Sequence, residues 1–440
     1  MSTSLLTFAK GGVHPPESKE ITERLAIEKM PLPEEFEIPL LQHFGAPCQP
    51  LVKKKDRVEE GDLIGQVTGG LGANVHASVT GTITDIGTSI GPVSLNVPSV
   101  TISRDLEAPD KTYTPSDWKS LSPQELLSKI KDAGIVGIGG AGFPAHVKLA
   151  PPPGTKVDKL ILNGAECEPY LTTDHRVMLE KPEEVIVGAQ ILLRVLGISE
   201  GHIGVEANKS DAIDVLRKAA EAQKLHGAKI SIDALQVKYP QGSEKQLIES
   251  VTGRKVPGGG LPFDVGVIVQ NIGTTKAVYD AVVLNKPLYE KVITISGRGI
   301  SRPANLQVRV GTRIRDIVQY LGGTKPDLAK IVMGGPMMGF AVSTLDIPVT
   351  KTVSGVLFLT KEEIDDQPHG PCIRCGWCVE ACPMGLSPNE IGLYVEAGRA
   401  ADTAPFGVFD CFECGSCAFV CPAKRPLVQF IRLAKQKAKR

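Results

Sequence analysis

The sequence has 440 residues, in which 49 Lys and Arg residues balance 49 Asp and Glu residues. This length allows about three domains with cores of their own, and the balanced charge gives no overall attraction for nucleic acid or an anionic membrane. No run of eighteen apolar residues predicts a membrane span. Residues 1–10 lack the long apolar core and cleavage site of a signal peptide, so the cysteines are expected in a reducing cytosol.

The first hundred residues predict an arm followed by a small β domain. Residues 1–35 show little apolar periodicity and are expected to lie on another domain as an ordered arm. Over residues 36–103, short runs alternate apolar and polar side chains and are separated by glycines. This pattern resembles the barrel-sandwich hybrid domain of biotinyl and lipoyl carriers. Those carriers need a lysine on an exposed hairpin, and residues 72–75 (Gly-Ala-Asn-Val) occupy that place, which favours a structural or docking role.

Residues 120–285 predict the α/β core of a multidomain chain, in which strands and helices alternate. A helix begins at Ser122, where Ser-Pro-Gln-Glu forms a capping box, and ends at Gly134. Another helix is expected to be capped by Ser210. Such alternation predicts a mostly parallel sheet covered on both faces. The predicted strands lie at 159–163, 202–206, 229–233 and 265–270, and a further helix lies at 183–196. Residues 290–345, with short strands and a brief helix at 314–321, predict a small α+β unit.

A glycine-rich loop lies between the first helix and the first strand of this core. Its sequence, Gly-Ile-Gly-Gly-Ala-Gly-Phe-Pro, contains G-x-G-x-x-G, but it does not follow a strand as a Rossmann fingerprint does. Its backbone amides can approach a planar or phosphorylated ligand, and Lys148 can supply a positive charge to a phosphate. A glycine-rich turn without a ligand is the alternative. The glycines are Gly137, Gly139, Gly140 and Gly142.

A polar segment, Asn-Gly-Ala-Glu-Cys-Glu-Pro, directly follows the first predicted strand. Ligands of open α/β sheets bind at the carboxyl ends of strands. Asn163 can hydrogen-bond the edge of an isoalloxazine ring, and Glu166 and Glu168 suit ribose or amide hydrogens. A solvated acidic loop is the alternative for the two carboxylates. Cys167 has no histidine nearby in sequence and is interpreted as an ordinary thiol.

Residues 362–440 contain the strongest signal, a cysteine run that occurs twice. Both copies read C-x2-C-x2-C-x3-C-P, the bacterial ferredoxin run, in which the fourth cysteine binds the other cluster. Zinc usually takes two separated ligand pairs, and disulfides would need a secreted chain, so two 4Fe–4S clusters are predicted. One is assigned to Cys372, Cys375, Cys378 and Cys421, and the other to Cys411, Cys414, Cys417 and Cys382.

Two helices are predicted around the cysteine runs. A second capping box at Ser387 is expected to start a helix that runs to about residue 401. The tail, residues 426–440, is expected to be helical with a basic end. Basic residues there complement the helix dipole in a solvated helix end, and attraction to an acidic partner or lipid is the alternative.

Four segments of the chain resemble motifs of the flavin- and NADH-binding subunit of respiratory complex I. The glycine loop and the Asn163 segment resemble its G-R-G-G-A-G-F-P and N-A-D-E-x-E-P motifs. Segments beginning at Tyr239 (Y-P-Q-G-S-E) and Gln270 (Q-N-I-G-T) resemble its Y-x-x-G-E-E and N-N-V-E-T motifs. The whole chain, from the arm to the cysteine runs, resembles the C-subunit family of Rnf electron-transport complexes. That resemblance also implies that the α+β unit is a soluble-ligand-binding β-grasp (SLBB) domain.

The resemblance implies which residues hold the flavin and the nucleotide. The implied FMN contacts are Gly137, Gly139, Gly140, Gly142, Lys148, Asn163, Glu166, Tyr239, Gly242, Gln270, Asn271 and Thr274. The implied NAD(H) contacts are Phe143, which can stack on a ring, Glu168 and Glu244. The sequence differs from the complex I motifs at Ile138 (arginine), Ala165 (aspartate), Ser243 (glutamate) and Gly273 (glutamate).

The resemblance also implies a function, electron exchange between NAD(H), FMN and two 4Fe–4S clusters without a catalytic side chain. The implied partners are the membrane subunits and the ferredoxin-like iron–sulfur subunit of the ion-translocating ferredoxin:NAD+ oxidoreductase. The implied location is peripheral, on the cytoplasmic side of the inner membrane. Two alternatives remain open. One is a soluble cobalamin reductase, a family with the same flavin core and cluster pair but without the region equivalent to residues 11–103. The other is an electron-relay adaptor with a vestigial flavin fold.

Overall fold

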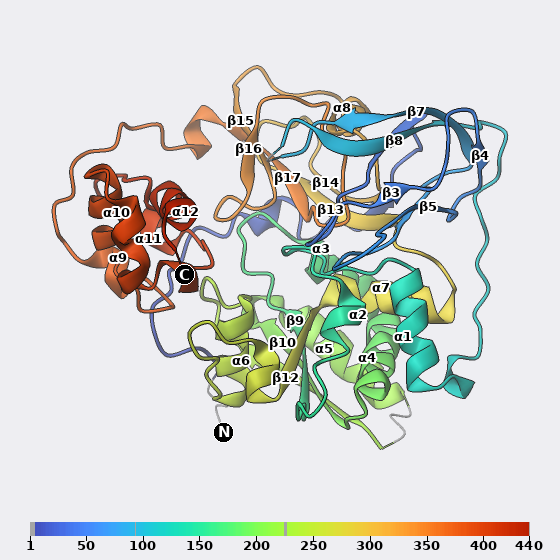
Figure 1. The fold of residues 1–440 in the computed structure, drawn as a ribbon, viewed down its shortest axis with the longest axis horizontal. Coiled ribbons are helices and arrows are strands. Elements are labelled where there is room, and N and C mark those ends of the chain that lie inside the picture. The colour runs from blue at the N-terminus through green and yellow to red at the C-terminus, as the bar shows by residue number, and fades with distance from the viewer. Residues whose placement is uncertain (1–4, 93, 224–226, 440) are drawn as a thin grey trace.

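The computed structural model describes residues 5–92, 94–223 and 227–439, which form four units (Figure 1). An α/β unit lies at the bottom of the view, two β-rich units lie above it, and a helical unit formed by the C-terminal residues lies at the left. The predicted multidomain α/β class is confirmed. Within the described ranges, no helix combines the length and the apolar character needed to cross a membrane.

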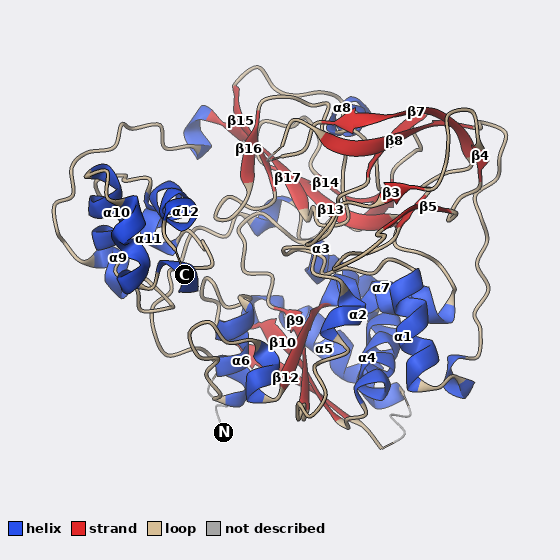
Figure 2. Cartoon of the chain, viewed as in Figure 1, coloured by secondary structure: helices blue, strands red, loops and turns tan. Residues whose placement is uncertain are grey.

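Residues 35–104 form two small antiparallel sheets that share one apolar core, as predicted for a barrel-sandwich hybrid (Figure 2). Phe36, Ile64 and Ile102, which come from both sheets, are fully buried in it. At the place of the carriers' lysine, Asn74 donates to the carbonyl of Asp132 (3.2 Å) and its own carbonyl accepts from Lys351 (2.6 Å), so this turn contacts the neighbouring units. The strands, in sheet order, are β2 (Glu35–Pro39), β8 (Val97–Arg104), β7 (Gly81–Ser89) and β4 (Arg57–Val58), then β3 (Gln49–Pro50), β5 (Leu63–Gln66) and β6 (Val75–His76).

The α/β unit has the predicted parallel sheet with helices on both faces. Along the central strand, Leu160 and Leu162 pack into one core and Ile161 packs into the other, because successive side chains point to opposite faces. The sheet order is β11 (Lys229–Leu235), β10 (Glu200–Glu206), β9 (Lys159–Gly164) and β12 (Val267–Asn271). The larger core contains α1 (Pro123–Asp132), α3 (Thr173–Glu180), α4 (Pro182–Leu196), α5 (Ser210–Ala222) and α7 (Ile272–Val283), and α6 (Glu244–Thr252) packs on the opposite face.

One predicted helix cap forms and two do not. The Ser122 hydroxyl accepts from the Glu125 amide (3.3 Å), and the Glu125 carboxylate accepts from the Ser122 amide (2.7 Å). Ser210 is the first residue of α5 and does not cap it. Ser387 makes no side-chain cap bond either, and the Glu390 carboxylate of the predicted box accepts from the neighbouring Asn389 (3.2 Å). That helix, α10 (Pro388–Glu396), ends earlier than predicted, because Gly398 adopts a positive φ (+73°) that terminates it.

The third unit is built on a six-stranded sheet that is larger than the predicted segment 290–345. Its edge strand β1 (Ile27–Lys29) comes from the N-terminal arm and pairs in parallel with β14 (Ala304–Arg309). Its strand β17 (Gly355–Thr360) lies beyond the predicted end of the unit. The remaining elements are β13 (Glu290–Ser296), β15 (Leu328–Met333), β16 (Phe340–Val342) and α8 (Ile314–Tyr320).

The fourth unit places the two cysteine runs at equivalent positions. Each run continues into a one-turn helix, α9 (Trp377–Glu380) or α11 (Ser416–Phe419), preceded by a glycine with φ of 84° or 82°. The tail is helical as predicted, in α12 (Leu427–Lys437). Its basic Lys435 donates to the Cys411 carbonyl (2.6 Å) and pairs with Glu413 (2.7 Å). This lysine therefore holds the second cysteine run in place.

The arm connects the units, as predicted for an ordered segment lying on another domain. Residues 1–4 of it lie outside the described part of the chain. Val13 pairs with Tyr239 on the α/β unit, and the Gly12 amide donates to the Ala381 carbonyl (3.0 Å) beside the first cysteine run. Farther along, the buried Lys19 ammonium donates to the carbonyls of Glu166 and Glu168 in the polar segment and to that of Leu171 just after it. The arm thus contacts both the polar segment of the α/β unit and the first cysteine run.

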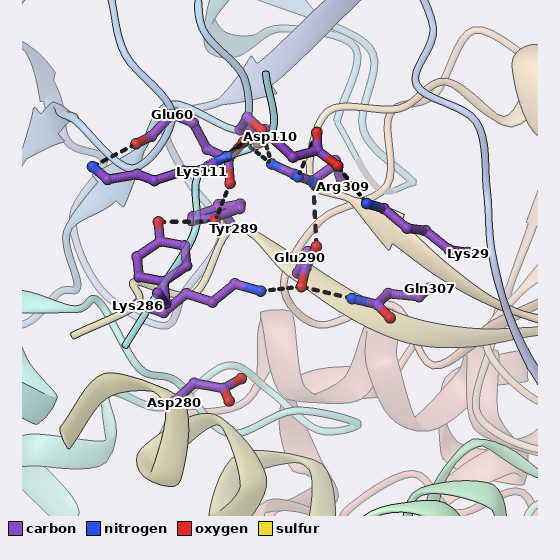
Figure 3. A network of polar contacts seen from close by, with 12 residues as sticks. Lys29, Glu60, Asp110, Lys111, Asp280, Lys286, Tyr289, Glu290, Gln307 and Arg309 are labelled. Carbon is purple, nitrogen blue, oxygen red and sulfur yellow. Dashed lines mark hydrogen bonds and ion pairs between the residues drawn. The ribbon is translucent and has the colours of Figure 1, made fainter. Parts of the chain in front are cut away.

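A network of buried charged side chains joins the hybrid unit to the third unit, the one that the sequence predicts to be an SLBB domain (Figure 3). The guanidinium of Arg309 lies between the carboxylates of Glu60 (2.9 Å) and Glu290 (3.2 Å), and it donates to the Ser78 carbonyl (2.6 Å). The Tyr289 hydroxyl donates to Glu60 (2.5 Å). Arg309 and Glu60 are each 5% exposed, so little water competes for these charges.

Arg309→Met is expected to lower the free energy of unfolding by about 3–5 kcal/mol, because it leaves the buried Glu60 carboxylate without its cation. It also removes one of the two cations that pair with Glu290, which keeps Lys286. Arg302→Met is the matched control, since Arg302 pairs with Glu28 at the surface and should contribute about 1 kcal/mol or less. Urea unfolding of both variants measures the difference. Equal destabilisation would contradict the assignment of a buried, interdomain role to Arg309.

Candidate active site

The glycine loop joins α1 to the short helix α2 (Ala145–Lys148) and leaves open space beside it. The Gly137 amide donates to the Phe143 carbonyl (2.9 Å), which closes the loop. Gly139 has φ +75° and is exposed, and a Cβ added at Gly140 would meet no heavy atom within 4 Å. Gly142 instead is buried, and a Cβ there would lie 2.8 Å from Thr352. A Cβ added at Gly139 would lie 3.1 Å from the Ser354 hydroxyl, so the free side of the loop is at Gly140.

Strands β9 and β12 are neighbours in the sheet and end side by side. Asn163 lies in register with Asn271 on the neighbouring strand. The Asn163 amide donates to the Gly242 carbonyl (2.7 Å), which brings the Tyr239 segment to the same edge. Gln270 is only 3% exposed, and its Nε2 has no hydrogen-bond partner among the described residues. A buried amide without a partner is the kind of group that a polar ligand satisfies.

Asn271 and Thr274 hold the glycine loop in place. Asn271 Oδ1 caps α7 by accepting from the Thr274 amide (3.2 Å), and its Nδ2 donates to Asp174 (2.6 Å). The Thr274 hydroxyl accepts from the Ile138 amide (2.8 Å) and donates to the Val136 carbonyl (3.3 Å). Thr274 is fully buried, so its hydroxyl is used in positioning the loop.

Glu166 has a comparable internal task at the start of α3. Its carboxylate accepts from the amides of Asp174 (2.7 Å) and His175 (3.1 Å), where the helix dipole favours negative charge. Burial and then the nearby Glu166 raise the pKa of Asp174 to about 7. The sequence indicated Glu166 as a ribose or amide acceptor and carried no signal for this capping role.

Lys148 and Glu244, predicted for FMN and for NAD(H) respectively, form an ion pair. Lys148 Nζ lies 2.5 Å from a Glu244 carboxylate oxygen and also donates to the Val269 carbonyl (2.7 Å). Both side chains are partly exposed at the carboxyl end of the sheet. The fold thus brings together two candidates that lie 96 residues apart in sequence.

Glu168 and Tyr239 lie where the candidate flavin site meets the cysteine runs. One Glu168 carboxylate oxygen accepts from the Met337 amide (3.1 Å), in the SLBB loop at 334–339, and the other is buried without a partner among the described residues. Burial raises the pKa of Glu168 to about 7. The Tyr239 hydroxyl donates to the carbonyl of Cys414 (2.6 Å). Cys167 accepts from the Gly242 amide (3.3 Å), and burial raises the pKa of its thiol, as expected of an unreactive cysteine.

Glu168→Gln is expected to change how stability depends on pH. The folded chain keeps the Glu168 proton up to about pH 7, whereas the unfolded chain releases it near the ordinary value of 4.5. Between these values the folded state binds more protons, so the free energy of unfolding decreases as pH rises from about 4.5 to 7. The glutamine variant avoids this loss and should be more stable than the parent at pH 8 by about 1–3 kcal/mol. Urea unfolding at pH 5 and pH 8 measures it, with exposed Glu362→Gln as control. Identical pH slopes for the parent and the glutamine variant would contradict it.

The eight predicted cluster cysteines fall into the two predicted sets. Cys372, Cys375, Cys378 and Cys421 line one small cavity, although Cys421 comes from the second run. In the other set, burial and then neighbouring thiols raise the pKa of Cys411, Cys414 and Cys417, and Cys382 is among these neighbours for all three. Cys417 is also close enough to Cys378 of the first set for that thiol to contribute. Within the described chain no three acidic, His or Cys side chains converge closely enough to hold one metal ion. In a cubane each cysteine binds a different iron, so four thiols around one cavity are a fitting donor set.

The residues present also fit a flavin. The free face of the glycine loop, the unpartnered Gln270 amide, Asn163 and the Lys148 cation surround one edge of the sheet. Sequence reasoning missed two contributions from outside the α/β unit. Phe44, in the hybrid unit, donates its amide to the Gly142 carbonyl (3.0 Å), and the SLBB loop at 334–339 lies against Glu168. Neither segment carries a recognisable motif, because each depends on domain packing.

Comparison with known proteins assigns all four units. The chain matches family models described as "Nuo51 FMN-binding domain" at residues 130–280, "RnfC Barrel sandwich hybrid domain" at 7–107, "SLBB domain" at 292–341 and "4Fe-4S dicluster domain" at 371–425. These matches confirm the predicted fold class, and they support FMN and 4Fe–4S clusters as the cofactors.

Two curated relatives align over nearly the whole chain. The C-subunit of the proton-translocating ferredoxin:NAD(+) oxidoreductase complex of Clostridium ljungdahlii is 47% identical, over 98% of this chain and 94% of its own. The C-subunit of the Na(+)-translocating ferredoxin:NAD(+) oxidoreductase complex of Acetobacterium woodii is 41% identical, over 97% of this chain and 96% of its own. A solved chain of an NAD+-reducing [NiFe]-hydrogenase in the H2-reduced state shares the fold, with a TM-score of 0.54 and 18% identity over 75% of this chain and 65% of that one.

Proposed function

The chain belongs to the C-subunit family of Rnf-type ion-translocating ferredoxin:NAD+ oxidoreductase complexes, and from this we propose that it exchanges electrons with NAD(H) at an FMN site and conducts them through two 4Fe–4S clusters. One observation carries the proposal. The Tyr239 hydroxyl, from a segment of the candidate flavin site, hydrogen-bonds the carbonyl of Cys414, a proposed cluster ligand (2.6 Å). The candidate flavin site and the second cysteine set are therefore in direct contact.

The proposed FMN site uses the backbone of the glycine loop and a few polar side chains. Gly139 and Gly140 let the ligand approach the backbone, Asn163 and Gln270 offer amides, and Lys148 offers a cation for the phosphate. When bound, FMN supplies the exchange of an electron pair with nicotinamide and of single electrons with clusters. No side-chain acid or base is assigned. With FMN and the nucleotide bound, the role of the chain would be to position the two rings and to exclude water from them.

The two cysteine sets differ in where they lie. Cys414, of the second set, belongs to an apolar cluster with Val13, Tyr239 and Ala381, which faces the candidate flavin site. Cys375, of the first set, is exposed, and Trp377 beside it is 53% exposed. We assign the second set to the cluster that exchanges electrons with the flavin, and the first set to the cluster that exchanges them with a partner subunit.

The proposed partners are the other subunits of the complex, namely its membrane subunits and its ferredoxin-like iron–sulfur subunit. The relatives are named as subunits of proton- or Na(+)-translocating complexes, and ion translocation requires a membrane. We therefore place the chain at the inner membrane as a peripheral subunit on the cytoplasmic side, where NAD(H) and ferredoxin meet.

The test is NADH oxidation by the anaerobically purified chain with ferricyanide as acceptor. The proposal expects FMN-dependent turnover, together with capture of the chain by the membrane subunits. A flavin-free chain without this activity would be the electron-relay adaptor instead. Turnover with cob(II)alamin and no capture would support the cobalamin reductase.

A further inference from the structure

A cavity lies beside the glycine loop, where the α/β unit meets the third unit. Ile138 of the loop and Gly273 of α7 line it together with Lys291 of β13. Its volume of about 70 Å³ has room for several waters, because one water needs about 10–15 Å³. Lys181 also lines the cavity, and its side chain is 48% exposed, so the cavity reaches the surface of the molecule.

Two buried groups make this cavity polar. Asp280 pairs with Lys276 through one carboxylate oxygen (2.7 Å), and its other oxygen is buried without a partner among the described residues. In Figure 3, Asp280 on α7 lies on one side of the domain boundary and Glu290 on β13 lies on the other. Lys291 is 7% exposed, and its ammonium donates to the Lys351 carbonyl (2.9 Å). Such groups favour ordered water in the cavity.

Asp174 lies between this cavity and the candidate flavin site. One of its carboxylate oxygens accepts from Asn271 Nδ2 (2.6 Å), an atom that would lie 4.0 Å from a Cβ added at Gly139 of the glycine loop. The other oxygen faces Gly273, where an added Cβ would lie 3.6 Å from it. Since Gly273 lines the cavity, the carboxylate can be reached from both sides.

Asp174 and Lys291 change their charge in the same pH range. Burial and then Glu166 raise the pKa of Asp174 to about 7, and burial lowers the pKa of Lys291 to about 7. Each group favours the charged form of the other. A proton can therefore pass between them near neutral pH at little cost in free energy.

Other charged groups face this pair from the elements packed around it. The Glu166 carboxylate at the start of α3 opposes ionisation of Asp174, and Lys209 just before α5 favours it. Among the described residues, neither Asp174 nor Lys291 has a direct ion-pair partner, so water would bridge them. The other charges of the cavity wall are paired: Lys181 with Glu184, Lys276 with Glu184 and Asp280, and Glu290 with Lys286 and Arg309.

We propose that Asp174 and Lys291 relay protons between the flavin site and this cavity, an inference that rests on the proposed NAD(H) exchange. Oxidation of NADH breaks its C4–H bond and yields NAD+, two electrons and one proton. The clusters accept only the electrons, so the proton must leave the site separately. Asp174 takes it up, water carries it to Lys291, and it reaches the surface near Lys181. When NAD+ is reduced, the proton moves inward along the same groups. Hydride transfer itself still uses no side-chain acid or base.

Asp174→Asn is the direct test, because asparagine keeps the acceptor for Asn271 and cannot ionise. In the FMN-loaded chain, this change is expected to lower kcat for NADH oxidation with ferricyanide about 10-fold at pH 7 and to leave KM for NADH within about 2-fold. It should also remove an inflection near pH 7 from the pH profile of kcat. FMN content should not change. The control is Asp316→Asn, a partly buried aspartate of α8 outside the cavity lining.

Infrared titration of the same chain gives a readout that needs no turnover. The carbonyl band of protonated Asp174 should disappear near pH 7. It should be missing from Asp174→Asn and kept in Glu168→Gln, which removes the other buried carboxyl with a pKa of about 7. In Lys291→Met the band should persist to higher pH, because the ammonium that favours the ionised carboxylate is gone.

The contrary results can be told apart. A parent chain that oxidises no NADH refutes the proposed function and the relay with it. If the parent is active and Asp174→Asn keeps the kcat and the pH profile of the parent, only the relay is refuted. Loss of FMN from Asp174→Asn, with full activity restored by added FMN, would reduce Asp174 to a structural role. An infrared band that Lys291→Met leaves at the same pH would show that the two groups do not exchange a proton.

Discussion

Cys382→Ala and Cys417→Ala are expected to abolish the same iron–sulfur cluster, although Cys382 lies in the first cysteine run and Cys417 in the second. Cys382 lies with Cys411, Cys414 and Cys417, and the first set takes Cys421 in exchange. Either substitution should reduce iron from about eight to about four atoms per chain and remove one of two paramagnetic signals. Cys378→Ala and Cys421→Ala should both remove the other signal.

Electron paramagnetic resonance of the reduced variants shows which cluster each cysteine substitution removes. Cys48→Ala is the control, because Cys48 is a buried thiol of the hybrid core that belongs to neither set. Loss of the same signal from Cys382→Ala and Cys378→Ala would mean that each run binds its own cluster, and the crossed assignment would be wrong.

Gly140→Val is expected to weaken FMN binding without unfolding the α/β unit. The space beside Gly140 is empty within 4 Å and its φ lies outside the left-handed region, so the chain itself tolerates a side chain. If FMN occupies that space, the added atoms overlap the ligand at a cost of about 1–3 kcal/mol, or about 10- to 100-fold in affinity. FMN content after gel filtration, and the loss of NADH oxidation that follows from it, measure the effect.

Gly69→Val is the matched control, because Gly69 also has open space and belongs to the hybrid unit instead of the α/β unit. Normal FMN content in Gly140→Val would show that the ligand does not lie on this side of the loop. A collapsed circular dichroism spectrum would instead show that the glycine is needed for folding. Gly142→Val is expected to do this, because its Cβ would lie 2.8 Å from Thr352 at a φ of +70°.

The sequence predicted those parts of the structure that depend on local patterns. The cysteine spacing predicted the crossed grouping of the thiols, which is built into the C-x2-C-x2-C-x3-C-P run, and the assignment of each cysteine to a cluster stays a prediction. The consecutive apolar residues at 160–162 predicted a strand, which is buried on both faces, and the polar residue that follows, Asn163, lies near its carboxyl end. The glycine loop lies between α1 and the first strand of the sheet, as predicted, with open space at Gly140, and its role in binding a ligand stays a prediction.

The remaining features depend on contacts between distant segments. Strand β1 is a three-residue segment whose partner lies nearly 300 residues away, so no local pattern reveals it. The sequence indicated Glu166 as a ligand-binding acid, but its carboxylate caps α3. The backbone turns at Glu166 with a φ of +46°, a geometry that the local sequence does not reveal. The position of Phe44 beside Phe143 depends on the packing of the hybrid unit against the glycine loop. The residues implied for FMN and NAD(H) remain predictions that the variants above test.

The most direct test of electron exchange in this chain is anaerobic titration of the purified protein with NADH. We expect about eight iron atoms and about one FMN per chain, with NADH bleaching the flavin absorbance and producing the paramagnetic signal of reduced clusters in the same sample. A chain with both cofactors at full content that NADH leaves wholly oxidised would contradict this exchange.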